Sequence, residues 1–326
     1  MSQSAFAHDF EFDPAYGYDL DRLLQVSAPS EPKDFASFWQ QTYHEALHTP
    51  LEVETRPIRS GRSDLEVFEI EFTSWRGVRI GGWLTRPVGG RPRRGVVAGH
   101  GYGGREAPDL DLPGPPATVI FPCLRGQGRS ATAGIPVLTW DHVLTGIESR
   151  ETYVHRGCVT DLWCAGSALI EIAPEAADNL HYMGGSFGGG IGAMAMAWDD
   201  RFKLGFLSVP SFGNHPLRVT LPCVGSGEAV RRYYQDHPEV LDVLAYFDSA
   251  LHARRIGVPV LCECALFDPA VPPPGQFAVY NALAGPKELA VRQAGHFSYP
   301  AEAGDNQRLR KALERWFSVS VSPTSL

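Results

Sequence analysis

Residues 180–190 read LHYMGGSFGGG, and this stretch decides which fold the chain can adopt. An apolar run comes first, Ser186 follows two glycines, and a segment of small residues continues after it. The pentapeptide Gly184-Gly185-Ser186-Phe187-Gly188 matches G-x-S-x-G, in which a serine sits on a sharp strand-to-helix turn. Such a turn strains the serine backbone, and side chains two positions away on either side would clash, so glycine is required there. The segment therefore predicts a nucleophilic serine at the carboxyl end of a strand.

Short apolar runs on both sides of this stretch predict a parallel sheet. Each run ends in small or polar residues, and amphipathic stretches starting at Asp161, Gly188 and Asn306 lie between or after them. The runs are GVVAGHG (95–101), TVIFPCLRG (118–126), LHYMGGS (180–186), LGFLSVP (204–210), PVLCECALFD (259–268) and ELAVRQAGH (288–296). This alternation predicts an α/β fold with a mostly parallel, doubly wound sheet and helices on both faces. In such sheets, ligands bind beyond the carboxyl ends of the strands.

The N-terminal part of the chain has a different pattern. Residues 35–48, FASFWQQTYHEALH, carry apolar side chains at helical spacing. Two β-like segments, one from Leu65 and one from Val78, are separated by a short turn and predict an antiparallel hairpin that leads into the sheet. We therefore expect one α/β domain over residues 1–326, in which residues 1–50 form an extension whose helix packs on it.

Composition excludes several classes of protein. The 326 residues are 44% hydrophobic and 20% charged, with a formal net charge of −8, which argues against a nucleic-acid partner. The basic residues Arg91, Arg93 and Arg94 are predicted to lie in a solvated loop. No apolar run approaches the roughly 18 residues of a membrane span, so no membrane association is expected. The first residues, MSQSAFAHDFEFD, do not resemble a secretory signal. The six cysteines, mostly in apolar runs, are typical of buried free thiols, and we expect a cytoplasmic location.

Candidates for a general base and its acid follow the serine in the order Ser, acid, His. Asp268 and His296 each end an apolar strand-like run, so both are predicted to lie at the carboxyl edge of the sheet near Ser186. His296 would take the serine proton, and Asp268 would hold the imidazole in the right tautomer. His215 is a weaker candidate for the base. Asp242 and Asp248 are rival acids that are more typical of helix surfaces or helix caps.

Two backbone amides are candidates for an oxyanion hole. One belongs to Phe187, directly after the nucleophile, and the other to Tyr102 in the glycine-rich loop VVAGHGYGG. The alternative is a plain glycine-rich turn with Tyr102 on the surface. His100 and His296 do not form a metal site, because no third ligand occurs at suitable spacing.

The sequence resembles the carbohydrate esterase family 7 enzymes, which are acetyl xylan esterases and cephalosporin C deacetylases of the α/β-hydrolase superfamily. The family signature Arg-Gly-Gln is matched by Arg125-Gly126-Gln127, and its G-x-S-x-G by the residues around Ser186. The acid segment is matched by FDPAVPP (267–273), and the terminal histidine by His296. Weaker similarity extends over most of the chain, for example in FWQQTYHEAL and TYVHRGCVTD.

This resemblance implies hydrolysis of short acyl esters, chiefly acetyl, of carbohydrates or related small alcohols. It implies no metal or organic cofactor, a small acylated substrate as partner, and a homo-oligomer that could be a ring-like hexamer. It also implies that the amides of Tyr102 and Phe187 are the oxyanion donors and that Arg125 and Gln127 support the active-site loops. Phe187 and Phe297 replace the family's usual Gln and Glu.

Bulky residues predict a small acyl pocket. Phe187, Pro210 and Phe212 could close it, or could instead be ordinary packing residues. Two other functions stay open. The chain could be another α/β-hydrolase, such as a thioesterase or peptidase, since a fold does not fix the substrate. It could also be a catalytically silent protein of this fold that binds a ligand or partner.

Overall fold

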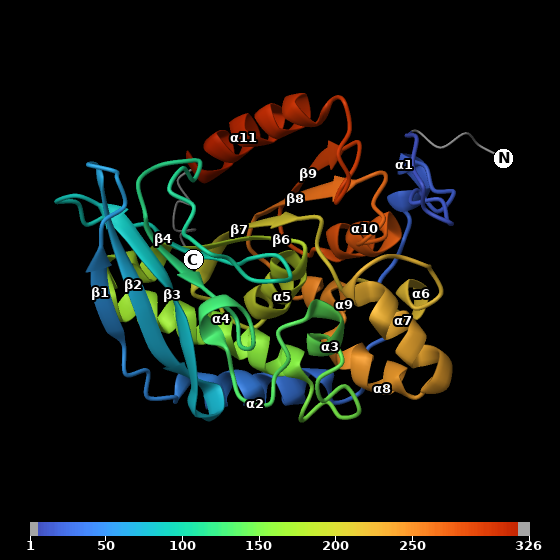
Figure 1. The fold of residues 1–326 in the computed structure, drawn as a ribbon, viewed down its shortest axis with the longest axis horizontal. Helices are drawn as coiled ribbons and strands as arrows, with labels where there is room; N and C mark the ends of the chain where they lie inside the picture. The colour runs from blue at the N-terminus through green and yellow to red at the C-terminus, as the bar shows by residue number, and fades with distance from the viewer. Residues whose placement is uncertain (1–5, 319–326) are drawn as a thin grey trace.

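The computed structural model describes residues 6–318, which form one nine-stranded sheet with helices packed around it (Figure 1). The strands are β1 (Glu54–Ile58), β2 (Leu65–Ser74), β3 (Val78–Pro87), β4 (Gly95–Ala98), β5 (Thr118–Pro122), β6 (Leu180–Gly185), β7 (Phe202–Ser208), β8 (Val260–Ala265) and β9 (Lys287–Arg292). The helices are α1 (Leu20–Leu23), α2 (Phe35–Leu47), α3 (Thr139–His142), α4 (Val154–Ile172), α5 (Phe187–Met196), α6 (His215–Arg218), α7 (Ser226–Asp236), α8 (Val240–Leu244), α9 (Ser249–Ala253), α10 (Pro273–Ala282) and α11 (Glu302–Ser318).

The sheet has the order β1-β2-β3-β5-β4-β6-β7-β8-β9. Strands β4 to β9 run parallel to one another, whereas β1, β2 and β3 pair antiparallel and β3 joins β5 antiparallel. The predicted lead-in hairpin is therefore present as β2 and β3. The edge strand β1 was not predicted, because its residues are mostly exposed and include Pro57, which is tolerated only at a sheet edge.

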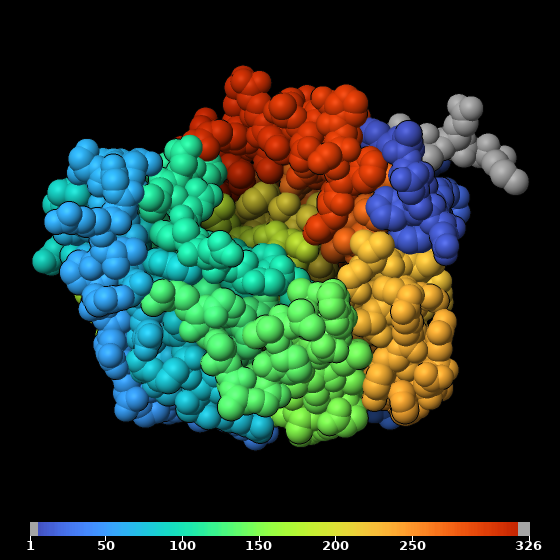
Figure 2. Space-filling model, viewed as in Figure 1, coloured from blue at the N-terminus to red at the C-terminus, as the bar shows by residue number. Residues whose placement is uncertain are grey.

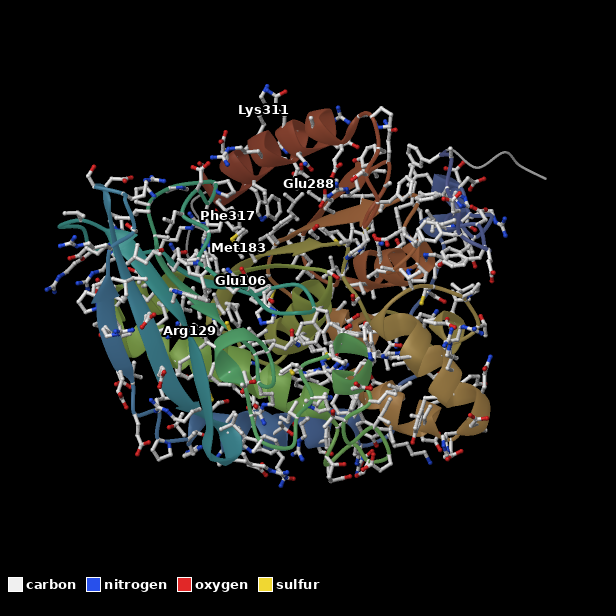
Figure 3. All side chains as sticks on the ribbon, in the orientation of Figure 1. Glu106, Arg129, Met183, Glu288, Lys311 and Phe317 are labelled. Carbon is white, nitrogen blue, oxygen red and sulfur yellow. The ribbon has the colours of Figure 1, made fainter. Side chains whose placement is uncertain are left out.

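The two faces of the sheet are covered unequally. Helices α2, α4, α5, α9 and α10 lie on one side, and α11 lies on the other (Figure 1). Every residue of α5 is buried, as are most of those of α4, because both helices lie between the sheet and outer elements. On the second face, Phe317 of α11 and Met183 of β6 point into the space between helix and sheet (Figure 3). A hollow remains between α11, the irregular segment 101–117 and the strands beneath (Figure 2), and it includes a cavity of about 150 Å³.

The N-terminal helix α2 packs against the parallel part of the fold. Trp39 is fully buried, donates from Nε1 to the carbonyl of Tyr246 at 2.8 Å and meets the ring of Trp163 on α4 edge to face. The spacing of apolar residues in 35–48 predicted that one face of this helix would be buried, as it is.

Several details differ from the sequence-based expectations. Helix α4 begins at Val154, about two turns before the expected Asp161, and α11 begins at Glu302 rather than near Asn306. Arg94 does not lie in a solvated loop. It is buried, donates from Nη1 to the carbonyl of Pro115 at 2.6 Å and lies over the ring of Phe317. The long aliphatic stem of arginine allows such burial when the head finds acceptors.

The six cysteines are free and buried. Within residues 6–318, no helix is both long enough and apolar enough to cross a membrane.

Replacing Trp39 by Ala is expected to lower the free energy of unfolding by roughly 3–5 kcal/mol, because it removes a buried aromatic side chain and leaves a cavity. Chemical denaturation followed by circular dichroism measures this change. The matched control is Trp140→Ala, since Trp140 is 51% exposed and should change stability little. If residues 1–50 belong to the same folding unit, the variant unfolds in one shifted transition. A separate early transition would show that the extension unfolds independently.

Candidate active site

Ser186 lies on the tight turn between β6 and α5. Its backbone angles are φ 55° and ψ −118°, a strained conformation for a residue with a side chain. A Cβ atom at Gly184 would come within 2.6 Å of the Tyr182 hydroxyl, and one at Gly188 would come within 2.7 Å of the His100 carbonyl oxygen. The two motif glycines therefore let the β6–α5 turn approach neighbouring backbone closely. The turn presents the partly exposed Ser186 at the carboxyl end of the sheet.

A continuous chain of hydrogen bonds joins Ser186, His296 and Asp268. Nε2 of His296 lies 2.9 Å from Oγ of Ser186, and Nδ1 lies 2.8 Å from Oδ2 of Asp268. Because a carboxylate only accepts, Nδ1 carries the proton and donates to Asp268, so Nε2 of the neutral ring accepts from the serine hydroxyl. The structure thus brings together the three residues that the sequence singled out, from the ends of β6, β8 and β9.

The carboxylate of Asp268 is fully buried and held from several sides. Its Oδ1 accepts from the backbone amides of Ala270 and Val271, both at 2.9 Å. Its Oδ2 accepts from Nε2 of Gln276 at 3.0 Å, and its own amide donates to the carbonyl of Pro14 at 3.0 Å. These bonds fix the carboxylate that orients His296. Gln276 was not predicted, since one glutamine at the start of an α-helix carries no sequence signal for this role.

The environment of His296 favours its protonated form. Burial by itself lowers the pKa of His296, but the hydrogen bond and the charge of Asp268 act in the opposite direction. Arg292 weakly opposes them, and the net effect is a pKa raised above the ordinary value of 6.5. A base with this environment is neutral in alkaline solution and readily accepts a proton.

Tyr102 lies in the loop after β4, with its ring against that of Phe187 at a centroid distance of 4.2 Å. Its hydroxyl lies 3.1 Å from Nδ1 of His142 and 3.1 Å from Nε2 of His155. The other ring nitrogen of His142, Nε2, lies 3.0 Å from the carbonyl oxygen of Arg125. Because a carbonyl oxygen only accepts, Nε2 carries the proton and donates to it. In the neutral ring, Nδ1 of His142 then accepts the Tyr102 proton, so Nε2–H of His155 donates to the Tyr102 oxygen.

Both imidazoles of this arrangement are kept neutral by burial. Burial lowers the pKa of His142 and lowers that of His155 well below its usual range. Neutral rings preserve the direction of the hydrogen bonds that hold the Tyr102 hydroxyl on both sides. His142 and His155 were not predicted, because they come from α3 and α4, far from the loop in sequence.

The residues of the Arg-Gly-Gln signature lie beneath the same loop. Arg125 is buried and forms an ion pair with Asp161, with Nη2 at 2.7 Å from Oδ1 and Nε at 3.0 Å from Oδ2. The Asp161 carboxylate also accepts from the Arg125 amide at 2.9 Å. Gln127 accepts from the amide of Gly103 at 2.9 Å through its Oε1. Gln127 therefore holds the loop that carries Tyr102, and Arg125 anchors the end of β5 to α4.

The predicted pocket residues lie close to the nucleophile but are enclosed. Phe187 and Phe212 are buried and meet edge to face with ring centroids 6.0 Å apart, and Pro210 is also buried. Phe297 packs on Phe267 in a separate aromatic cluster, at a centroid distance of 5.1 Å. The phenyl ring that replaces the family's usual glutamate thus has apolar neighbours.

The rival candidates occupy other places. His215 is buried, and its Nε2 bonds the carbonyl of Phe247 at 3.2 Å. Asp248 caps α9 by accepting from the Ala250 amide, while Asp242 is exposed on α8. Nδ1 of His100 donates to the carbonyl of Gly101, and Nε2 accepts from the amide of Leu124, so both ring nitrogens have partners.

Comparison with known proteins gives a consistent result. A family model described as acetyl xylan esterase (AXE1) matches residues 18–310. Acetyl esterase Axe7A of Xylanibacter ruminicola is 22% identical in an alignment of 296 positions that covers 85% of this chain. The chain spans 66% of that relative's length.

Two solved structures are similar over nearly their full lengths. An acetyl xylan esterase from Paenibacillus sp. R4 has a TM-score of 0.77 at 24% identity, with 90% of this chain and 99% of that chain covered. Acetyl xylan esterase 1 from Thermoanaerobacterium sp. JW/SL YS485 has a TM-score of 0.79 at 22% identity, with 93% and 99% covered. These similarities confirm the predicted α/β-hydrolase fold.

The raised pKa of His296 gives a direct test of the hydrogen-bonded chain. In a titration followed by NMR of the imidazole, the midpoint of His296 is expected above 6.5, and Asp268→Asn should move it to lower pH by removing the charge that raises it. Because the folded pKa is raised, the contribution of this pair to stability is fully present below pH 6.5. This contribution is lost as the pH rises through the pKa of His296 in the folded protein.

The control for this titration is Asp242→Asn, since Asp242 is exposed on α8. It should leave the midpoint unchanged. A midpoint that moves in Asp242→Asn but stays in place in Asp268→Asn would contradict the assignment of Asp268 as the partner of His296.

Proposed function

Since the chain belongs to the acetyl xylan esterase family, we propose that it is a serine carboxylesterase that removes short acyl groups, chiefly acetyl, from carbohydrates or related small alcohols. The observation that carries this proposal is the hydrogen-bonded chain from Ser186 through His296 to Asp268. Nucleophile, base and orienting acid within hydrogen-bond reach are what covalent acyl transfer needs.

The reaction proceeds in two halves. Ser186 Oγ attacks the ester carbonyl while its proton passes to Nε2 of His296, and the same proton then goes to the leaving alcohol as the C–O bond breaks. Water next attacks the acyl-enzyme and gives its proton to His296, which passes that proton to Oγ of Ser186 as the bond between Oγ and the acyl carbon breaks and the carboxylic acid leaves. Asp268 stabilises the imidazolium in both halves and keeps Nδ1 protonated.

The amides of Tyr102 and Phe187 are proposed to bind the oxyanion. Phe187 is the first residue of α5, and the first amides of a helix have no acceptor within it. The helix dipole adds partial positive charge at this end. Contact between the Tyr102 and Phe187 rings supports the idea that the two amides are held in a fixed relation. Arg125 and Gln127 support this arrangement from below, through Asp161 and Gly103.

A short acyl group is the best fit beside the nucleophile. The buried rings of Phe187 and Phe212 and the nearby Pro210 leave little room for a long chain. A homo-oligomer, up to the hexamer that the resemblance implies, and a cytoplasmic location stay predictions. No metal or organic cofactor has a step in this mechanism.

Initial rates on p-nitrophenyl acetate, butyrate and octanoate test the acyl preference. The rate should fall steeply from acetate to octanoate, because the longer chain clashes with the rings beside Ser186. Ser186→Ala should lower kcat on the order of 10⁶-fold. Octanoate hydrolysed as fast as acetate would overturn the small pocket. A wild-type protein that neither hydrolyses these esters nor reacts with a fluorophosphonate probe would overturn the esterase assignment.

The hydroxyl of Tyr102 provides a second test, because it can be removed while the backbone amide and the ring remain. Tyr102→Phe leaves His142 and His155 without their shared partner, and we expect kcat to fall roughly tenfold with little change in KM. Tyr246→Phe is the matched control, since its hydroxyl bonds Asp34, the residue before α2, rather than the two histidines that hold Tyr102. An equal loss of kcat in both variants, or a change in KM alone, would contradict a role in positioning the oxyanion amide.

A further inference from the structure

Arg218, the last residue of α6, is a buried cation without a counter-ion among the described residues. It is 4% exposed, and its Nε and Nη1 have no hydrogen-bond partner within residues 6–318. The neighbour that its guanidinium faces is the ring of Phe212, whose centroid is 5.7 Å from Cζ. Burying a charge without a partner costs several kcal/mol, so such a group points to an anion that is supplied from outside the chain.

The guanidinium lies against the first turn of α7. A Cβ atom added to Gly227 would come within 2.6 Å of Sγ of Cys223 and within 2.7 Å of Nη2 of Arg218, so the absence of a side chain there leaves both groups their space. The first amides of this 11-residue helix lack acceptors within it, and its dipole places partial positive charge at the same end. A cation and a positive helix end therefore occupy one location, and both favour an anion.

The acidic residue of this turn is already engaged. Glu228 pairs with Arg231 at 2.7 Å and with Arg232 at 2.9 Å. These two bonds account for the low pKa of Glu228, about 2, against an opposing effect of burial. Glu228 thus neutralises the outer arginines of α7 and leaves Arg218 unmatched.

The neighbouring imidazoles do not supply the missing charge. His155 and His215 lie beside the same Phe212 ring, at centroid distances of 4.5 and 6.3 Å, and each has an Nδ1 without a partner in the described chain. Burial, and then the charge of Arg218, lowers the pKa of His215 to about 3, and burial is also the main cause of the low pKa of His155. Both rings are neutral, so the guanidinium is the charged group of this cluster.

This cluster adjoins the proposed active site. Phe212 contacts both groups, since its ring centroid is 6.0 Å from that of Phe187 and 5.7 Å from Cζ of Arg218. The loop that leads into α7 is joined to the loop of the acid, because the amide of Val224 donates to the carbonyl of Pro269 at 2.8 Å. Arg218 is therefore about one aromatic ring away from the residue that follows the nucleophile.

We propose that Arg218 and the N-terminus of α7 bind a carboxylate carried by the ester substrate, so that the enzyme selects acidic esters over neutral ones. This proposal rests on the proposed esterase function and adds the charge of its substrate. The carboxylate belongs either to the alcohol or to the acyl part, and both give the same charge-assisted hydrogen bonds to the guanidinium.

Two pairs of substrates separate these sources. The alcohol is probed with para-acetoxybenzoate against para-acetoxybenzamide, and the acyl part with monoethyl succinate against ethyl succinamate. In each pair the carboxylate is replaced by a neutral amide of similar size. The measured quantity is the ratio of kcat/KM for the acidic ester to that for its amide. This ratio does not depend on the fraction of active enzyme, so partial misfolding of a variant leaves it interpretable.

Arg218→Met should lower this ratio at least tenfold in one of the two pairs, because it removes charge-assisted hydrogen bonds to the carboxylate. Arg218→Lys, which keeps the charge but not the fork of donors, should give an intermediate ratio. Gly227→Ala, which places a methyl group against both Sγ of Cys223 and Nη2 of Arg218, should also lower the ratio by displacing the guanidinium. The matched control is Arg93→Met, which removes the same charge from an exposed position just before β4, at the amino-terminal end of a central strand, whereas the active site lies at the carboxyl ends of the strands.

Each outcome has a distinct meaning. A lowered ratio in the benzoate pair places the carboxylate on the alcohol, and one in the succinate pair places it on the acyl group. Ratios that stay the same in Arg218→Met for both pairs, or that fall equally in Arg93→Met, overturn the carboxylate site while the esterase stands. A wild-type protein that hydrolyses neither the neutral nor the acidic esters overturns the esterase function itself.

Discussion

The turn between β6 and α5 is the constraint on which the rest of the structure depends. Ser186 keeps a positive φ there because the fully buried α5 and the parallel strands beside β6 leave the chain no alternative path. The turn packs so tightly against its neighbours that residues 184 and 188 must be glycine, and at Gly188 the neighbour is the loop after β4. Strain at one residue is thus maintained by the packing of the whole central layer.

From this turn, the site extends by contacts between residues far apart in the sequence. Phe187 brings its ring to Tyr102, and the Tyr102 hydroxyl links α3 to α4 through two neutral histidines. Below them, the ion pair of Arg125 with Asp161 fixes the end of β5 to α4. A phenylalanine after the nucleophile is therefore accommodated by an aromatic neighbour, and the loop is held by hydrogen bonds from Tyr102 and Gly103 to residues of other segments.

The sequence predicted the parts of the site that local chain geometry determines. Ser186, Asp268 and His296 each end a strand, and parallel strands bring their carboxyl ends to one edge of a sheet, so these residues could be found from pattern alone. His142, His155 and Gln276 could not, because their roles arise from side-chain contacts across the fold. Arg94 was misplaced because a run of arginines next to glycine and proline resembles a loop, whereas its guanidinium is buried over the ring of Phe317. The edge strand β1, exposed and containing Pro57, has no apolar pattern to reveal it.

The hydrogen bond between the Asp268 amide and the carbonyl of Pro14 joins the beginning of the chain to its last third. With His296 coming still later, the catalytic arrangement depends on contacts that span almost the entire sequence. Such non-local contacts form slowly in folding, because the chain entropy of closing a long loop must be overcome first. During synthesis the ribosome must therefore release the chain at least through His296 before the serine can meet its base. An unfinished chain therefore contains Ser186 without the partners that would make it reactive.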